Sequence, residues 1–277
     1  VSGTVNVVSS TTTYALTLSF VSSTLNNNEW SVIKSVSDAG QGASYWSIGD
    51  RKAVTLNGTV GALTLSNVTT YVFIIGFNHN AIVEGANRIH FQLGKTALTG
   101  GADVALCDYY YGQSGSFAMN DQDTTAGGWK SSTMRTKICG TSLTSYSGTF
   151  IAFIPDALRA VLKSVTKYTD NTGGQSTSAN AVTATTDYFF LLSEYEVFGR
   201  CELGNTNEKN KQAQYDYYSA GNSKIKYNHS ETSTPIWWWL RSQSTGFYSY
   251  FLLVYTSGTC NVNNADISGG FAPGFCV

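Results

Sequence analysis

The sequence predicts an α+β fold for most of the chain, and three observations support this. Candidate strands outnumber candidate helices and lack the regular alternation with helices that a doubly wound fold requires. Only two or three stretches show helical periodicity, and they are modest in length. The connections are repeatedly longer than those of most compact domains. We therefore expect many short strands, two or three helices and long loops.

The composition of the 277 residues narrows the class of protein. Charged residues make up 13% of the chain, well below the usual ~25%, so uncharged polar residues must cover much of the surface. The formal net charge is −1 without a basic block, which argues against nucleic-acid binding. No apolar run reaches about 18 residues, so we expect no membrane insertion. The chain begins with Val and shows no signal peptide, so we expect a mature form or a fragment.

The chain has five cysteines, and no two of them form a C-x-x-C pair. This argues against a zinc knuckle or a thiol redox motif. We expect mostly free, buried thiols, with one disulfide left open as an alternative. The cysteines are Cys107, Cys139, Cys201, Cys260 and Cys276.

Residues 1–28 are predicted to form a separate β-rich arm or the end of a preceding module. Residues 5–8 and 14–21 have the pattern of strands, with larger and smaller side chains alternating in the second. The three asparagines at 26–28 mark a break. The arm is too small for its own core, so residues 29–277 are expected to form the main domain.

The first half of this domain begins with a short amphipathic helix at 30–36. A hairpin should follow, with Asn57 and Gly58 as its two-residue turn. The apolar run at 71–77 predicts a buried strand, and alternation at 88–93 predicts another.

The second half offers a mixture of elements. We expect, in order, a helix at 129–138, a short strand at 149–154, the clearest helix at 155–165, a polar loop at 167–185, a strand at 188–197 and a polar helix or helical loop at 207–220.

Several residues have side chains that catalysis can use. On a strand, Glu194 and Glu196 would project from one face about 7 Å apart, near the separations that glycosidases use. We prefer a structural interpretation, in which at least one of them pairs with an arginine such as Arg241. No G-x-S-x-G elbow, P-loop or G-x-G-x-x-G motif occurs. We therefore assign no catalytic residue and no cofactor.

The histidines and the tryptophans also admit two interpretations. His79 and His90 are candidates for a metal or general-base site, but neither they nor His229 show metal-ligand spacing. Structural, hydrogen-bonded histidines are preferred, and no metal is assigned. The run Trp237–Trp239 would suit stacking on a sugar, but we prefer a place in the core.

The last forty residues differ from the rest of the chain. Apolar segments at 237–242 and 270–277 enclose residues 243–269, which are rich in Ser, Thr, Gly, Asn and Tyr. This is the composition of an antibody paratope, in which Tyr supplies rigid contact area and small polar residues supply adaptable hydrogen bonds. We expect the enclosed segment to be displayed on the surface.

These segments carry a resemblance to a known family. The sequence WWLRS at 238–242, the polar interval and GFAPGFCV at 270–277 resemble the C-terminal signature of variable proteins of diversity-generating retroelements. Segments 77–80, 89–92 and 152–155 also resemble a domain of unassigned function that is common in gut bacteria and their phages.

The resemblance implies a C-type-lectin-like fold with short twisted antiparallel sheets, a ligand-binding domain at 29–277 and a variable region at about 238–277. In such proteins, errors in copying template adenines scatter Asn codons into many residue types. The positions that match the scaffold are Trp239, Leu240, Arg241, Val254, Gly258, Ala265, Gly270, Phe271, Pro273 and Phe275. The hypervariable, ligand-binding candidates are Ser244, Gly246, Phe247, Ser249, Tyr250, Leu253, Tyr255, Asn261, Asn263, Asn264, Asp266, Ile267 and Gly269.

Strand alternation adds one detail to this assignment. Leu253 and Tyr255 share a face opposite Leu252 and Val254, so we expect the first pair to be displayed if the second faces the core. Gln243 departs from the family pattern, which often has Pro there, so the entry to the loop differs.

The resemblance implies a non-enzymatic protein that binds a protein or glycan ligand on a cell surface. The expected setting is a phage tail, or the bacterial cell surface or exterior, with a homo-oligomer left open. One alternative is an oxidase like the formylglycine-generating enzymes, with Cys260 and Cys276 as reactive thiols. Another is a lectin of fixed specificity that uses the Trp cluster with Glu194 and Glu196.

Overall fold

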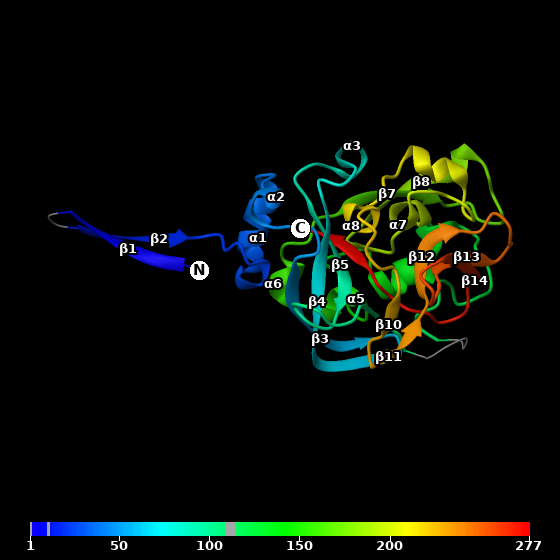
Figure 1. Ribbon diagram of the computed structural model, residues 1–277, viewed down its shortest axis with the longest axis horizontal. Coiled ribbons are helices and arrows are strands. Elements are labelled where there is room, and N and C mark those ends of the chain that lie inside the picture. Colours follow the sequence, from blue (N-terminus) through cyan, green and yellow to red (C-terminus); the bar gives the residue numbers. More distant parts are fainter. Residues whose placement is uncertain (1, 10–11, 109–114) are drawn as a thin grey trace.

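The computed structural model describes residues 2–9, 12–108 and 115–277, and it has an α+β fold, as predicted. Most strands pair antiparallel in small curled sheets, and short helices lie around them (Figure 1). No helix within the described ranges is long and apolar enough to span a membrane.

The strands are β1 (Ser2–Ser9), β2 (Thr12–Ser19), β3 (Arg51–Val60), β4 (Leu63–Phe77), β5 (Ile89–Lys95), β6 (Val104–Ala105), β7 (Val165–Asp170), β8 (Val182–Asp187), β9 (Phe189–Phe190), β10 (Lys226–Asn228), β11 (Glu231–Ile236), β12 (Trp238–Gln243), β13 (Tyr250–Val254), β14 (Cys260–Asn264) and β15 (Gly274–Cys276). The α-helices are α1 (Trp30–Asp38), α2 (Gly42–Tyr45), α3 (Ala81–Glu84), α4 (Gly128–Ser131), α5 (Phe150–Phe153), α6 (Asp156–Arg159), α7 (Glu194–Phe198) and α8 (Asp216–Ser219). Single turns of other helix types are η1 (Leu25–Asn27), the π-helical η2 (Met134–Cys139), η3 (Ala179–Ala181) and η4 (Thr206–Asn210).

The N-terminal arm contains the two predicted strands. β1 and β2 pair antiparallel from Ser2 with Ser19 to Ser9 with Thr12. Figure 1 shows this hairpin extending away from the rest of the chain, next to α1. Residues 1, 10 and 11 of the arm lie outside the described residues.

A five-stranded sheet with the order β3-β4-β5-β15-β9 forms the centre of the body. The apolar run at 71–77 forms the buried end of β4, as expected. The C-terminal strand β15 lies between β5 and β9, where Phe275 pairs with Phe91 on one side and Phe189 on the other. The frame of the C-terminal segment is therefore part of the central sheet.

The predicted turn at Asn57 and Gly58 is wrong. β3 continues through both residues to Val60, which pairs with Leu63, so the turn lies at residues 61–62. Gly58 instead adopts φ 126° where the register of β3 and β4 shifts. The Asn-Gly pair lies at a β-bulge here, because the apolar residues beyond it extend the hairpin.

Several predictions for the second half are also wrong. Within residues 149–154, which were predicted as a strand, Phe150–Phe153 form helix α5, since a short apolar run fits either element. The stretch 167–185, predicted as a polar loop, contains most of the β7–β8 hairpin, whose threonines are β-branched. At 188–197 only Phe189–Phe190 is a strand, and α7 follows.

The three helices predicted in the second half are shorter than their periodicity indicated. The helix at 155–165 ends at Arg159, the one at 129–138 is split into α4 and η2, and the one at 207–220 contains only η4 and α8. Tertiary packing, which single-segment periodicity does not report, sets these ends.

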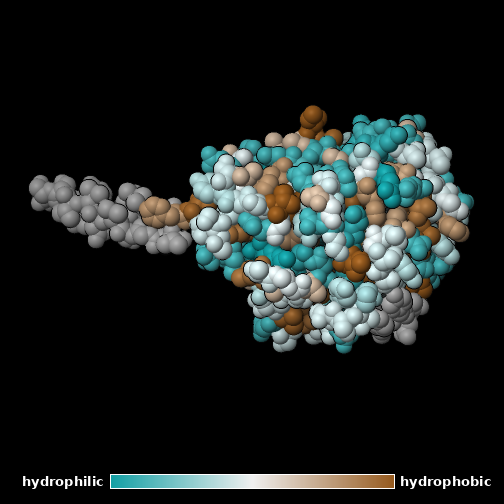
Figure 2. Space-filling model, in the orientation of Figure 1, coloured by the Kyte–Doolittle hydropathy of each residue, from teal (hydrophilic) through white to brown (hydrophobic). Residues whose placement is uncertain are grey.

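The C-terminal segment forms a three-stranded antiparallel sheet with the order β12-β13-β14. Tyr250 pairs with Asn264 at one end of β13–β14, and Val254 pairs with Cys260 at the other. β13 is the central strand and is mostly buried, whereas β14 is an edge strand and is more exposed. Over the face of the molecule in Figure 2, hydrophobic residues lie scattered among polar ones.

Candidate functional site

The three consecutive tryptophans lie in the core, as preferred above. Trp237 is 3% exposed, and Trp238 and Trp239 are fully buried. The indole N–H of Trp238 donates to the carbonyl of Lys224 at 2.9 Å, and that of Trp239 donates to the carbonyl of Phe117 at 3.1 Å. Because all three rings are buried, they cannot stack on a sugar.

The positions that match the scaffold form a buried frame. All of them are buried except Gly258, which is half-buried in the turn after β13 at φ 83°, a conformation that favours glycine. The buried members are Trp239, Leu240, Arg241, Val254, Ala265, Gly270, Phe271, Pro273 and Phe275.

Arg241 joins this frame to the body through a buried ion pair, as predicted. Its guanidinium donates to the two carboxylate oxygens of Glu196 at 2.5 and 2.9 Å and to the hydroxyl of Thr169 at 2.8 Å. Burial alone would raise the pKa of Glu196, but the charges of Arg241 and Lys167 outweigh burial and lower that pKa. Glu196 is therefore a fixed anion and not a proton donor at neutral pH.

Glu194 lies in helix α7, where it organises a loop. Its carboxylate accepts the backbone N–H groups of Glu202, Leu203 and Gly204 at 2.8–3.0 Å. The carbonyl of Leu203 in turn accepts the backbone N–H of Thr245 at 2.9 Å. Both glutamates are buried and occupied by structural contacts, so a glycosidase or a sugar site built on them is not supported.

A buried cap and two neighbouring loops fix the backbone of residues 244–249. The hydroxyl of Ser244 accepts the N–H groups of Gly246 and Phe247, each at 3.1 Å. The side chain of Gln175 donates to the backbone carbonyl of Gly246 at 2.9 Å. The hydroxyl of Thr125 donates to the backbone carbonyl of Tyr248 at 2.8 Å. The loop backbone is therefore held from three sides.

The side chains of the same loop face solvent. Phe247 is 54% exposed and Tyr248 is 69% exposed. The ring of Phe247 stacks on that of Tyr250, with centroids 4.9 Å apart and planes at 17°. The loop thus presents aromatic surface on a backbone that is already ordered.

The edge strand β14 and the turn after it continue this surface. Asn261 is exposed, and Asn263 and Asn264 are half-buried. Asp123, from a neighbouring loop, accepts the side-chain amide of Asn264 at 2.8 Å and the backbone N–H of Ala265 at 3.2 Å. Asp266 and Ile267 follow, both half-buried.

We define the C-terminal face as the candidates for diversification that are exposed or half-buried, together with Tyr248. Its members are Gly246, Phe247, Tyr248, Ser249, Tyr250, Tyr255, Asn261, Asn263, Asn264, Asp266 and Ile267. Tyr255, 40% exposed, is set apart from Phe247 by the length of β13, about 17 Å for five residues.

Three candidates from the sequence do not belong to this face. Leu253 is 2% exposed, because β13 is the central strand and both of its faces are covered, so the prediction that it is displayed is wrong. Ser244 is buried as the cap described above. Gly269 is buried under Trp237, and a Cβ built on it would lie 1.9 Å from Cζ3 of that ring.

Sequence reasoning missed Tyr248, the most exposed aromatic residue of the segment. The strand alternation used to sort displayed from buried positions does not apply inside a turn. The run of small polar residues around Tyr248 was the available signal, since aromatic side chains in such runs are typical of binding loops. Thr125 and Gln175, which brace the loop, gave no signal in sequence.

None of the five cysteines, which all lie within the described residues, takes part in a disulfide. Cys276 is fully buried, and burial raises the pKa of its thiol to about 12. Burial, together with the neighbouring carboxylate of Glu194, also raises the pKa of the Cys260 thiol. A reactive thiolate needs a lowered pKa and access to solvent, and the pKa values of both thiols are raised instead.

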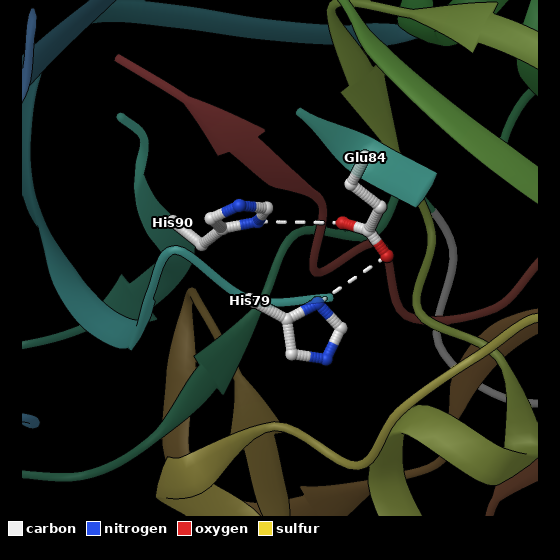
Figure 3. Close-up of side chains that lie close together, drawn as sticks. All are labelled: His79, Glu84 and His90. Atoms are coloured by element: carbon white, nitrogen blue, oxygen red, sulfur yellow. Dashed lines mark ion pairs between the residues drawn. The ribbon is translucent and has the colours of Figure 1, made fainter. Parts of the chain in front are cut away.

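A second constellation lies apart from the C-terminal face. His79 follows β4, Glu84 belongs to α3 and His90 belongs to β5, and their ligand atoms all lie within 4.8 Å of one another. Figure 3 shows the carboxylate of Glu84 between the two imidazoles. Burial, and then the charge of the nearby Lys167, lower the pKa of His90 well below its ordinary value. Sequence spacing did not reveal this group, because Glu84 enters from the short helix α3 in the connection between β4 and β5.

The comparisons with known proteins give a family but no activity. No match to the chain was found among curated proteins or among solved structures. A family described as a domain of unknown function, DUF6273, matches residues 106–277, which is more than half of the chain and includes the whole C-terminal face. The chain therefore belongs to the DUF6273 family.

Proposed function

We propose that the chain is a non-enzymatic binding protein that recognises a protein or glycan on a cell surface through the C-terminal face. In this proposal the scaffold is C-type-lectin-like, and the face varies between copies of the gene as in the variable proteins of diversity-generating retroelements. The setting that we propose is a phage tail that recognises its host, or display on a bacterial surface.

One observation carries the proposal: a backbone held from three sides presents exposed aromatic side chains. Ordering a flexible loop during binding opposes association, and a preformed loop avoids much of that cost. Phe247 and Tyr248 supply contact area, while the surrounding Ser and Asn residues supply hydrogen bonds that adapt to different partners. The buried frame lets the exposed positions change without loss of the fold.

The alternatives have less support. The oxidase alternative needs reactive thiols, whereas Cys276 is buried and the pKa values of Cys260 and Cys276 are raised. The fixed-specificity lectin was placed on the Trp cluster and the two glutamates of α7, which are buried and already occupied by intramolecular contacts.

The test is binding of the fluorescently labelled protein to a panel of intact bacterial cells, read by flow cytometry. Substituting Phe247→Ala and Tyr248→Ala together removes two half- to two-thirds-exposed rings. If each ring buries its exposed part, roughly 2 kcal/mol of binding free energy is lost per ring. One such ring corresponds to about a 30-fold loss of affinity.

Tyr45→Ala is the matched control, because Tyr45 is 39% exposed on α2, outside the C-terminal face. We expect the double variant to lose cell binding and the control to keep it. Retained binding by a folded double variant would contradict the proposal.

A further inference from the structure

The cluster of His79, Glu84 and His90 is built around an unpartnered nitrogen. Nε2 of His79 lies 2.9 Å from the carbonyl oxygen of Ala213. A carbonyl oxygen only accepts, so Nε2 carries the hydrogen. In the neutral ring, Nδ1 therefore bears a lone pair, and this buried atom has no hydrogen-bond partner among the described residues.

That lone pair faces a second acceptor. Oε1 of Glu84 lies 3.3 Å from Nδ1 of His79, and both side chains are 3% exposed. Two acceptors that face each other away from water repel unless a proton or a metal cation lies between them. His90 extends the arrangement, with its Nδ1 3.8 Å from Oε2 of Glu84.

We propose that His79, Glu84 and His90 bind one divalent transition-metal ion of the zinc type. Two imidazoles and one carboxylate are a donor set that zinc accepts, with a fourth position left open. Metal–ligand distances of about 2.0–2.1 Å place tetrahedral donors about 3.3 Å from one another. The pair from His79 and Glu84 has this spacing. The ligand atoms of all three residues lie within 4.8 Å of one another, so His90 has to move closer to the other two to bind the same ion.

The surroundings orient these donors. The His79 N–H to the Ala213 carbonyl is the outer contact that metal-binding histidines usually make. The ammonium of Lys167 donates to Oε2 of Glu84 at 2.7 Å, which leaves Oε1 for the ion. The sulfur of Cys276 lies 3.3 Å from Nδ1 of His90, so it also contacts the atom of His90 that would bind the ion.

Two features limit the affinity. Lys167 is a buried cation next to Glu84, so its charge opposes a metal ion. Nδ1 of His90 also lies 3.1 Å from the hydroxyl of Tyr215, a contact that metal binding would replace. We therefore expect weaker binding than in zinc sites that contain several thiolates.

Two of the three ligands, His79 and Glu84, belong to the loop of residues 78–88, whose other residues are exposed or half-buried. Ile82, two residues before Glu84 in α3, is fully exposed, and Figure 2 shows a strongly hydrophobic group protruding over this helix. An ion can therefore enter if the loop of residues 78–88 moves, without opening the central sheet.

The first experiment uses the wild-type protein, stripped with a chelator, dialysed against ZnCl₂ and desalted. Mass spectrometry of metal content should find one zinc ion per chain, and Co²⁺ in place of Zn²⁺ should give the visible absorption of a four-coordinate site. Zinc should also raise the melting temperature, because the ion binds the folded state. A folded wild-type protein that retains neither ion would overturn the proposal.

The second experiment tests the residues. His79→Asn should abolish retention, whereas His229→Asn should not, since His229 lies outside the cluster and its Nδ1 accepts the backbone N–H of Cys107 at 3.3 Å. Equal retention by both folded variants would also overturn the proposal. If His79→Asn does not fold, long-range ¹H–¹⁵N spectra of the wild type decide. Hydrogens on both nitrogens of His79 in excess Zn²⁺ would show that a proton, and not a metal, separates the two acceptors.

Discussion

Gly269→Ala tests the division of the C-terminal segment into a buried frame and an exposed face. The resemblance to variable proteins made Gly269 a candidate for diversification, whereas the structure places it beneath Trp237. The added Cβ would meet Cζ3 of Trp237 at 1.9 Å and Cη2 at 2.2 Å, so the ring has to move. That ring cannot move freely, because it packs edge-on against Trp239 with centroids 4.8 Å apart.

The expected cost combines two contributions. Overpacking a filled core by one methyl group costs about 1–3 kcal/mol. Disturbing an aromatic pair adds about 0.5–1.5 kcal/mol. A total of roughly 2–4 kcal/mol lowers the melting temperature of a chain of this size by roughly 4–16 °C.

Gly246→Ala is the control, since the nearest atom to its added Cβ is the hydroxyl of Ser244 at 3.8 Å. Neither glycine has positive φ, so both substitutions restrict the unfolded chain in the same way and that effect cancels in the comparison. The assay is urea unfolding of both variants beside the wild type. Equal stability of the two variants would refute the assignment of Gly269 to the frame.

Three further predictions concern the support of the face. Burial raises the pKa of Glu208 to about 7. The stability that protonated Glu208 contributes is therefore fully present below about pH 4.5 and is lost as pH rises through 7. The free energy of unfolding should fall by on the order of 3 kcal/mol over this range, and urea unfolding at a series of pH values should show a smaller fall for Glu208→Gln. Arg241→Met leaves the buried Glu196 carboxylate without its main partner and should lower the free energy of unfolding, measured by chemical denaturation, by about 3–5 kcal/mol. A second substitution, Glu196→Leu, should recover part of this lost stability. Leu253→Ala should cost about 2–5 kcal/mol, whereas Asn261→Ala, directly opposite on β14, should change the melting temperature little.

The parts of the fold that sequence predicted are those with one dominant local signal. The apolar run at 71–77 became the buried end of β4, and the helix at 30–36 became α1. The prediction of a strand around Glu194 was wrong, because the apolar residues near it suggested a strand. Ser193 and Glu196 form a capping box, a local helix signal that is visible in sequence and outweighs this pattern.

The candidate site shows a different limit. Sequence separated the buried ends of the C-terminal segment from its polar middle, and nearly all scaffold positions are buried. Alternation could not show that both faces of β13 are covered, nor that Trp237 lies over Gly269. The group of His79, Glu84 and His90 depends on how a loop folds back on the central sheet, which no spacing along the chain encodes.

The most direct test of the central claim is to sequence the DNA for residues 238–277 in many copies of this gene within one population. Diversification of an exposed face predicts substitutions that trace to adenines and cluster at positions such as Phe247, Tyr250 and Asn261. Leu253 and Gly269 should stay constant, because they are buried. Substitutions spread evenly over frame and face, or a segment without variation in any copy, would contradict the account.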